Sequence, residues 1–277
     1  MPGARRVPYE TPDGEPPDEE RLRLFMSRHL VTFTGEIQQR RPEVAVFRDV
    51  FIYSGFLMNV VGLNLWVTAG HCIEHLEKLL AAPHVELLHS RFGDYHGLDA
   101  KFFEGYPMHY QPGMGQLLED RPAGIDFGFI ALDNLAAAAM EKNGVMPVTM
   151  SQFLRADEVE FLGFGMLGVP SALTERDAVG YTYYPQMIPL RRVDPSTSPL
   201  ATSNDWIAFQ IAPTFKGLDF KGMSGGPIFG LRDAGNGNLS YNIVAIQSSW
   251  DEERGIAFGC SLPHLFKAFE RYCDSQV

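Results

Sequence analysis

Short runs of alternating or clustered apolar residues recur along the chain from about residue 29. They are rich in β-branched and aromatic side chains, and turn-forming residues separate them, which favours the short strands of a barrel or sandwich. The first half contains LVTFTGE (30–36), EVAVF (43–47), DVFIYSGFLM (49–58) and LNLWVTA (63–69). The second half contains VEFLGFG (159–165), DWIAFQIAP (205–213), GGPIFGL (225–231), SYNIVAIQSS (240–249) and GIAFGCS (255–261).

Three other segments have the pattern and composition of helices, at 72–82, 134–144 and 262–273. Residues 1 to about 20 are rich in Pro, Glu and Asp, which predicts a disordered lead. The Pro- and Tyr-rich stretch 181–205 is interpreted as long loops and weak edge strands. The pattern therefore predicts two β-rich lobes followed by a C-terminal helix.

Composition and charge narrow the range of functions. A chain of 277 residues with a formal charge of −11 is a poor electrostatic partner for nucleic acid or an anionic membrane. No apolar run is long enough for a transmembrane helix, and the first residues lack the apolar core of a signal peptide. Three cysteines, at positions 72, 260 and 273, are too few for a disulfide framework. These features favour a reduced, cytoplasmic protein.

The segment KGMSGGPIFG (221–230) raises the question of a nucleophile. Its glycines permit positive φ angles and close approach of the backbone, so Ser224 is either a turn residue or a nucleophile. A serine hydroxyl needs a base, and His71 at the end of the strand-like run LNLWVTAGHC is a candidate. Asp126 lies among apolar residues in AGIDFGFIAL, where a carboxylate needs a partner.

TAGHC (68–72), IDFGFIAL (125–132) and GMSGGP (222–227) together resemble the three signatures of chymotrypsin-like (trypsin-like) serine peptidases. They occur in that family's order of His, Asp and Ser, and VEFLGFG and YSGFLM (53–58) resemble two of its strands. The resemblance spans about residues 29 to 273. It implies an all-β fold of two six-stranded antiparallel barrels with a C-terminal helix. The expected division is a lead over 1–22, a first barrel over 23–145 and a second over 146–277.

The resemblance also implies roles for these residues. Ser224 is expected to be the nucleophile, His71 the general base and then acid, and Asp126 the orienting carboxylate. The backbone N–H groups of Gly222 and Ser224 are expected to form the oxyanion hole. Such an enzyme hydrolyses peptide bonds of a protein or peptide substrate and needs no cofactor or metal.

The resemblance defines the substrate pocket less clearly than the catalytic residues. Leu218 occupies the position where trypsin-type members carry an acidic residue, which implies an uncharged P1 side chain, whereas a one-residue shift to Asp219 implies an acidic pocket. Ser248 corresponds to the serine that contacts the aspartate. Trp250 stands where many members have glycine and is expected to narrow the entrance.

Three departures from the family pattern concern activation and disulfides. Met223 replaces the aspartate that pairs with a newly cut N-terminus in secreted members. Phe220, and either Tyr53 or Ser54, stand where such members have cysteines. The chain is therefore expected to be restrained by narrow specificity, a closed cleft or a regulatory protein partner rather than by zymogen cleavage.

Three other interpretations remain open, and a fourth, the α/β-hydrolase one, fails on chain order. The glycine-rich segment is a plain turn, or the fold is a silent or latent protein-binding module. GMSGG also fits the G-x-S-x-G elbow of α/β hydrolases, but that fold needs an acid and a histidine after the serine. His71, Glu74 and His75 fit the H-x-x-E-H zinc pattern, although the strand-like lead into His71 suits a strand end better than a helix.

Overall fold

The computed structural model describes residues 5–6, 19–40, 47–60, 62–94, 106–149, 159–176, 181–199, 206–215, 217–235 and 238–275. Most of the predicted lead and most of the predicted strand 43–47 lie outside these residues. Two parts of the lead are ordered elements, contrary to the prediction. β1 (Arg5–Arg6) pairs with β17, and α1 (Glu19–Met26) is a helix that continues into the 3-10 turn η1 (Ser27–His29).

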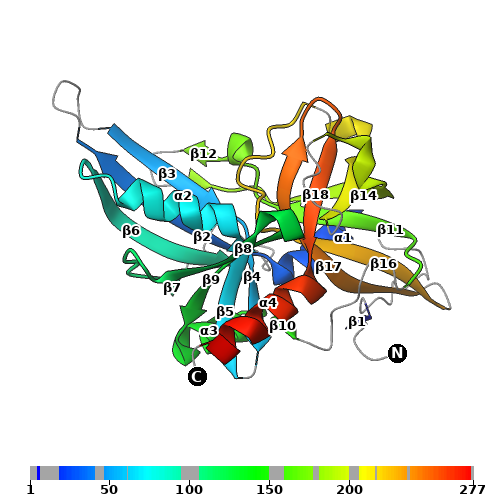
Figure 1. Cartoon of the computed structure of the whole chain (residues 1–277), viewed down its shortest axis with the longest axis horizontal. Coiled ribbons are helices and arrows are strands. Elements are labelled where there is room, and N and C mark those ends of the chain that lie inside the picture. The colour runs from blue at the N-terminus through cyan, green and yellow to red at the C-terminus, as the bar shows by residue number, and fades with distance from the viewer. Residues whose placement is uncertain are drawn as a thin grey trace.

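The strands of the C-terminal half close into a six-stranded antiparallel barrel (Figure 1). Neighbouring strands follow the order β11-β14-β15-β18-β17-β16, and β16 pairs back onto β11. These strands are β11 (Gly163–Gly168), β14 (Gln186–Val193), β15 (Trp206–Ile211), β16 (Pro227–Gly235), β17 (Asn238–Asp251) and β18 (Ile256–Ser261).

The interpretation of 181–205 as loops and weak edge strands was wrong for β14, which pairs on both sides, with β11 and β15. Its buried residues Met187, Ile188 and Leu190 are interrupted by an exposed Pro189, and this break hides the strand in the sequence. Pro189 has no N–H to donate to a neighbouring strand, but its carbonyl still accepts the N–H of Ala212 at 3.2 Å.

The N-terminal half forms two sheets. One has the order β3-β2-β6-β7 and the other β10-β4-β5-β9-β8. Within the described residues one closed barrel is present, in the C-terminal half, and the strand pairings describe the N-terminal half as two sheets. The strands are β2 (Val31–Gln39), β3 (Phe47–Tyr53), β4 (Phe56–Val60), β5 (Leu63–Ala69), β6 (Val85–Asp94), β7 (Tyr106–Pro107), β8 (Gly115–Asp120), β9 (Ile125–Leu132) and β10 (Val148–Thr149).

Two residues, Ser54 and Gly55, connect these sheets. β3 ends at Tyr53 in the first sheet, and β4 begins at Phe56 in the second. The carbonyl of Gly55 accepts a hydrogen bond from the N–H of Val31, at 2.9 Å, which ties the link to the start of β2. The link therefore lies at the junction of the two sheets.

All three predicted helices are present, with ends that differ by a few residues. They are α2 (Gly70–Leu80), α3 (Asn134–Lys142) and α4 (Leu262–Ser275). The remaining elements are the small pair β12 (Glu175–Arg176) and β13 (Tyr181–Thr182), with 3-10 turns at Arg121–Ala123, Ser171–Leu173, Pro195–Thr197 and Pro213–Phe215. In the described part of the chain, none of the helices combines the length and apolar character needed to cross a bilayer.

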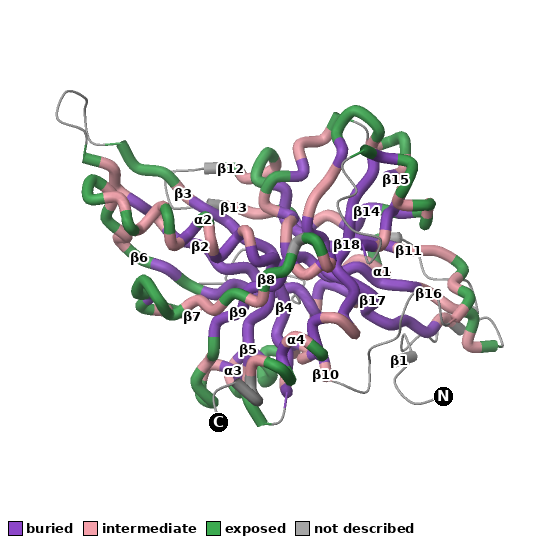
Figure 2. Tube along the Cα trace, viewed as in Figure 1, coloured by how far each residue is buried: buried purple, intermediate pink, exposed green. Residues whose placement is uncertain are grey.

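The two halves share a core where their strands meet, and this centre is the most buried part of the molecule (Figure 2). Strands β4, β5 and β9 contribute to it from one half and β11, β16, β17 and β18 from the other. His29 bridges the halves through a 2.8 Å hydrogen bond to the hydroxyl of Tyr241. α4 packs against β9, β17 and β18, with Phe269 edge-on to Phe129. This packing holds the two halves in one arrangement.

Candidate active site

The register of β5 and β9 brings Asp126 to His71. Ala69 pairs with Phe127, so Asp126 faces the point where β5 ends and α2 begins. His71 is the second residue of α2 and not the last of a strand, which corrects the sequence expectation. The N–H of His71 donates to Asp126 Oδ1 at 2.9 Å, and its Nδ1 bonds Oδ2 at 2.8 Å. A carboxylate at a helix N-terminus is also favoured by the helix dipole.

Gly70 allows this close approach of α2 to Asp126. A Cβ atom at position 70 would lie 2.7 Å from Asp126 Oδ1 and 3.1 Å from the carbonyl oxygen of Phe127. Any larger residue must therefore push the helix away from the carboxylate. The TAGH sequence thus has a local steric reason for its glycine.

Ser248, from the other half of the chain, completes the surroundings of Asp126. Gln247 pairs with Gly259 and Ser249 with Phe258, so Ser248 is the extra residue of a β-bulge in β17. Bulges redirect side chains and are common beside active sites. The Ser248 hydroxyl donates to Asp126 Oδ2, and Asp126 is 3% exposed. Three hydrogen bonds from two residues therefore satisfy a buried carboxylate.

This network shifts the pKa values of both partners in opposite directions. Burial alone lowers the pKa of His71, but its hydrogen bonds with Asp126 and Cys72 and the nearby negative charge outweigh burial and raise it. Burial alone raises the pKa of Asp126, but the hydrogen bonds and charge of His71 and the Ser248 bond hold it below its usual value. The pair is therefore built to stabilise an imidazolium beside a carboxylate.

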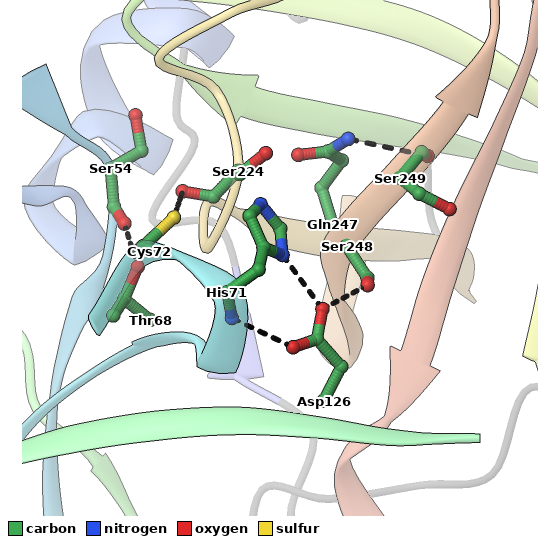
Figure 3. A network of polar contacts seen from close by, with 9 residues as sticks. All are labelled: Ser54, Thr68, His71, Cys72, Asp126, Ser224, Gln247, Ser248 and Ser249. Carbon is green, nitrogen blue, oxygen red and sulfur yellow. Dashed lines mark hydrogen bonds and ion pairs between the residues drawn. The ribbon is translucent and has the colours of Figure 1, made fainter. Parts of the chain in front are cut away.

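Ser224 lies on the other side of the imidazole from Asp126 (Figure 3). Its loop is fixed against β17, because the N–H of Gly225 donates to the carbonyl of Gln247 at 2.7 Å. The Cys72 thiol lies 3.7 Å from the carbonyl oxygen of Ser224 and donates to it. Within the described residues the Ser224 hydroxyl makes no hydrogen bond with His71. Such bonds are often long in free enzymes and tighten when substrate binds.

Two backbone N–H groups of this loop donate to no described group. Met223 N–H donates to Phe220, and Gly226 N–H donates back to Met223. The N–H groups of Gly222 and Ser224, on either side of Met223, have no acceptor among the described residues. Gly222 and Ser224 are both partly exposed, and two unpaired N–H groups from one turn can together bind an anionic or carbonyl oxygen.

Gly222 adopts a conformation that other residues rarely take. Its φ is +89°, and a Cβ atom there would lie 2.6 Å from the carbonyl oxygen of Val169. Both the left-handed angle and the lack of space require glycine.

Two of the three residues predicted to line the substrate pocket pack on one apolar cluster. Leu218 and Trp250 pack on the same apolar cluster, which also contains Phe220 and Met223. The Phe220 ring meets Trp250 edge-on, at 5.0 Å between centroids. Asp219 turns toward Lys221 instead, accepting its N–H at 3.0 Å, and its side chain is 45% exposed. Asp219 is therefore paired within its own turn, while Leu218 packs on the apolar cluster.

Two polar residues of this region were missed in the sequence. The Ser54 hydroxyl donates to the carbonyl of Gly222 at 2.6 Å, although 168 residues separate them. Gln247 is 1% exposed and donates through Nε2 to the carbonyl of Ser249 at 3.3 Å. Its Oε1 has no partner among the described residues, and its amide lies beside Ser224 in Figure 3. A polar residue directly after the apolar run IVAI (243–246) was the available signal for Gln247.

The geometry gives no support to the zinc pattern. His71 Nδ1 is engaged by Asp126, while His75 Nδ1 bonds the hydroxyl of Tyr53 at 2.6 Å. In the part of the chain that the structure describes, no group of three or more His, Cys, Asp or Glu side chains converges on one point. Cys72 and Cys260 are buried free thiols.

Comparisons with known proteins do not assign the chain to a family: no family model matches it, and no curated protein matches it. The case for a function therefore rests on the geometry of the site and on the three sequence motifs.

Proposed function

We propose that this chain is a chymotrypsin-like serine endopeptidase that hydrolyses peptide bonds through an acyl-enzyme intermediate. The observation that carries the proposal is the convergence of three distant segments, with Asp126 buried and bonded to the ring of His71 and Ser224 across that ring. A serine, an imidazole and a carboxylate in this order are the working parts of acyl transfer.

The strand pairings support the same assignment for the fold. In the C-terminal barrel the first strand pairs with the second and fourth. In the N-terminal half β2 likewise pairs with β3 and β6, the link continues β3 into β4, and β9 lies between β5 and β8. We propose that these two sheets are the walls of a second barrel, which completes the two-barrel architecture.

Acylation follows from the positions of the groups. Ser224 Oγ attacks the substrate carbonyl carbon while His71 Nε2 accepts the hydroxyl proton. The Nδ1–H of His71 keeps its hydrogen bond to Asp126, whose charge stabilises the imidazolium. The carbonyl oxygen becomes an oxyanion that the N–H groups of Gly222 and Ser224 hold. His71 then gives its proton to the leaving amine nitrogen as the C–N bond breaks, which leaves an ester on Ser224.

Deacylation repeats these steps with water. His71 takes a proton from the water molecule as its oxygen attacks the ester carbon, and the ester bond breaks when that proton passes to Ser224 Oγ. An uncharged P1 side chain fits the apolar base at Leu218. The free thiols Cys72 and Cys260 fit a reducing compartment, and we propose a cytoplasmic site of action under restraint by narrow specificity or a regulatory partner.

One observation favours a second candidate, a latent peptidase fold that binds a partner protein. The Ser224 hydroxyl is not hydrogen-bonded to His71 in the described residues, so the resting nucleophile is not yet engaged by its base. In a latent protein, only a partner would bring the two groups together. The two candidates differ in turnover by the isolated chain.

Incubation with a peptide library, followed by mass spectrometry of new termini, tests the proposal. The wild-type chain is expected to cut a limited set of peptides after uncharged residues, and Ser224→Ala is expected to cut none of them. Persistent cleavage by Ser224→Ala contradicts the proposed nucleophile. A folded wild-type chain that cuts nothing favours the latent candidate.

A further inference from the structure

Ser54 uses its polar atoms to connect the N-terminal half to the loop that carries Gly222. Its N–H and its hydroxyl both donate to the carbonyl oxygen of Gly222, at 3.1 and 2.6 Å. The same hydroxyl oxygen accepts the N–H of Val169 at 3.0 Å, and Ser54 is 0% exposed. Its own carbonyl accepts the hydroxyl of Thr68 at 2.8 Å (Figure 3). A buried residue bonded this completely has little freedom to move.

The peptide groups on both sides of the Gly222 Cα atom are held in this way. Ser54 fixes the peptide between Gly222 and Met223, because it donates two hydrogen bonds to the carbonyl oxygen of Gly222. The N–H of Ser171 fixes the preceding peptide, because it donates to the carbonyl of Lys221 at 2.7 Å. In a planar trans peptide the N–H points opposite to the C=O, so the Gly222 N–H must point away from Ser171.

These contacts form a closed ring of hydrogen bonds. Ser54 bonds Val169, the chain continues through Pro170 to Ser171, Ser171 bonds Lys221, and the next residue returns to Ser54. The ring encloses the position where a side chain on Gly222 would collide with Val169. With Met223 fully buried in an apolar cluster, no charged group at that position is available to anchor the loop.

We propose that Ser54 is a positioning residue for the oxyanion hole: it fixes the Gly222–Met223 peptide directly, and through Val169 it holds the segment whose Ser171 N–H fixes the Lys221–Gly222 peptide, so that the Gly222 N–H faces the substrate carbonyl. The inference rests on the proposed function for its catalytic consequence, but the positioning itself does not. It also gives the contact between the two halves a chemical role, because a residue of one half sets a donor in the other.

The test compares Ser54→Ala with Ser27→Ala. Ser27 is a matched control, since it is also a buried serine (1% exposed) whose hydroxyl donates to a backbone carbonyl, that of Arg23 at 2.8 Å. Amide NMR of glycine-labelled protein reports the Gly222 N–H directly, without any substrate. The Gly222 signal is expected to shift or broaden in Ser54→Ala and to stay unchanged in Ser27→Ala.

Kinetics then measure the consequence for catalysis. Ser54→Ala is expected to lower kcat about tenfold to a hundredfold, below the full loss of one oxyanion donor, with little change in KM. Affinity for a peptide aldehyde, which forms a tetrahedral adduct, is expected to fall by a similar factor. Ser54→Cys keeps the side-chain volume and is expected to be intermediate, so a poorly folded alanine variant does not end the test.

The outcomes separate the two claims. A Gly222 amide signal that is unchanged in both Ser54 variants overturns the positioning role whatever the activity is. If the Gly222 signal shifts in Ser54→Ala but the wild-type chain hydrolyses nothing, the positioning role holds and the peptidase proposal is overturned. Equal losses of kcat in Ser54→Ala and Ser27→Ala indicate a general effect of stability and also overturn the inference.

Discussion

The two sides of the His71 ring differ in how completely their polar groups are paired. On one side, Asp126 is 3% exposed and accepts bonds from the backbone and ring of His71 and from Ser248. On the other side, the N–H groups of Gly222 and Ser224 have no partner among the described residues. The first side is fully paired within the protein, whereas the second keeps two donors without a partner among the described residues.

The proposed function accounts for this difference. A buried carboxylate without partners costs several kcal/mol, so the acid side must be satisfied before substrate arrives. Donors that stabilise a transition state work best when they are fixed in place and still unpaired. On the second side, Ser54 and Ser171 bond the carbonyl groups of Gly222 and Lys221. The N–H groups of Gly222 and Ser224 stay unpaired among the described residues.

The largest effect is expected on the acid side. Asp126→Asn should keep the fold but lower kcat by about 10⁴-fold, because an amide favours the wrong tautomer of His71 and does not stabilise the imidazolium. Steady-state hydrolysis of a peptide found in the library experiment measures the loss. Asp49→Asn, at an exposed position of β3, is the control and should retain full activity. Comparable activity of Asp126→Asn and Asp49→Asn contradicts the proposed role of Asp126.

On the oxyanion side, Gly222→Ala should lower kcat by about 10²–10³-fold, the usual loss for one oxyanion donor. The added Cβ meets the Val169 carbonyl at 2.6 Å and is strained at a φ of +89°. Gly62→Ala is a matched control, since Gly62 has a φ of +81° but nothing within 4 Å. A loss of kcat as large in Gly62→Ala as in Gly222→Ala attributes the effect to backbone strain rather than to the lost donor.

The titration of His71 sharpens the contrast. Its raised pKa means that the ring keeps its proton to a higher pH than a free histidine, whose pKa is about 6.5. In Asp126→Asn the carboxylate is gone while burial remains, so the pKa should fall below that of wild type. NMR of the His71 imidazole, recorded from about pH 4 to about pH 10, measures its pKa in the wild-type chain and in Asp126→Asn. An equal or higher pKa in Asp126→Asn contradicts the role of the carboxylate.

The two pKa shifts, which have opposite directions, also make the contribution of this pair to the free energy of unfolding depend on pH. Asp126, with its lowered pKa, stabilises the fold above its usual pKa and loses this contribution as the pH falls. His71, with its raised pKa, stabilises the fold at low pH and loses this contribution as the pH rises through its folded-state pKa. The pair is therefore most stabilising between these limits.

A smaller effect is expected at Gln247, whose buried Oε1 has no partner among the described residues. Gln247→Met keeps the shape and removes this unpaired acceptor, together with a weak 3.3 Å bond to Ser249. The free energy of unfolding should rise by about 1 kcal/mol, the lower end of the cost of an unpaired buried group. Urea denaturation measures it, and a clear decrease shows that the oxygen has a partner in solution.

Much of the fold was predictable because its signals are local. The strands around Trp66, Phe229 and Ile246 are apolar runs with turn residues between them, and the three later helices have strong helix formers. α1 was missed because its residues 19–26 begin with charged residues, and its buried face (Leu22, Phe25 and Met26) is defined by packing against the shared core. β14 was missed because Pro189 interrupts its apolar run.

The candidate site likewise has residues that local sequence patterns predict and residues whose roles depend on distant contacts. His71, Asp126 and Ser224 lie in short motifs that resemble known signatures, so the sequence predicted them together. The role of Ser54 depends on a contact with Gly222 across 168 residues, which no local pattern encodes. The different surroundings of Leu218 and Asp219 likewise depend on the turn in which Asp219 accepts the N–H of Lys221.

Fluorophosphonate labelling tests the central claim most directly, because it reports an activated serine without knowledge of the substrate. Intact mass and peptide mapping of the wild-type chain should show one adduct, on Ser224, and His71→Ala should abolish it or slow it by orders of magnitude. Absence of an adduct on a folded wild-type chain, or labelling of Ser224 at the same rate in His71→Ala, contradicts the account.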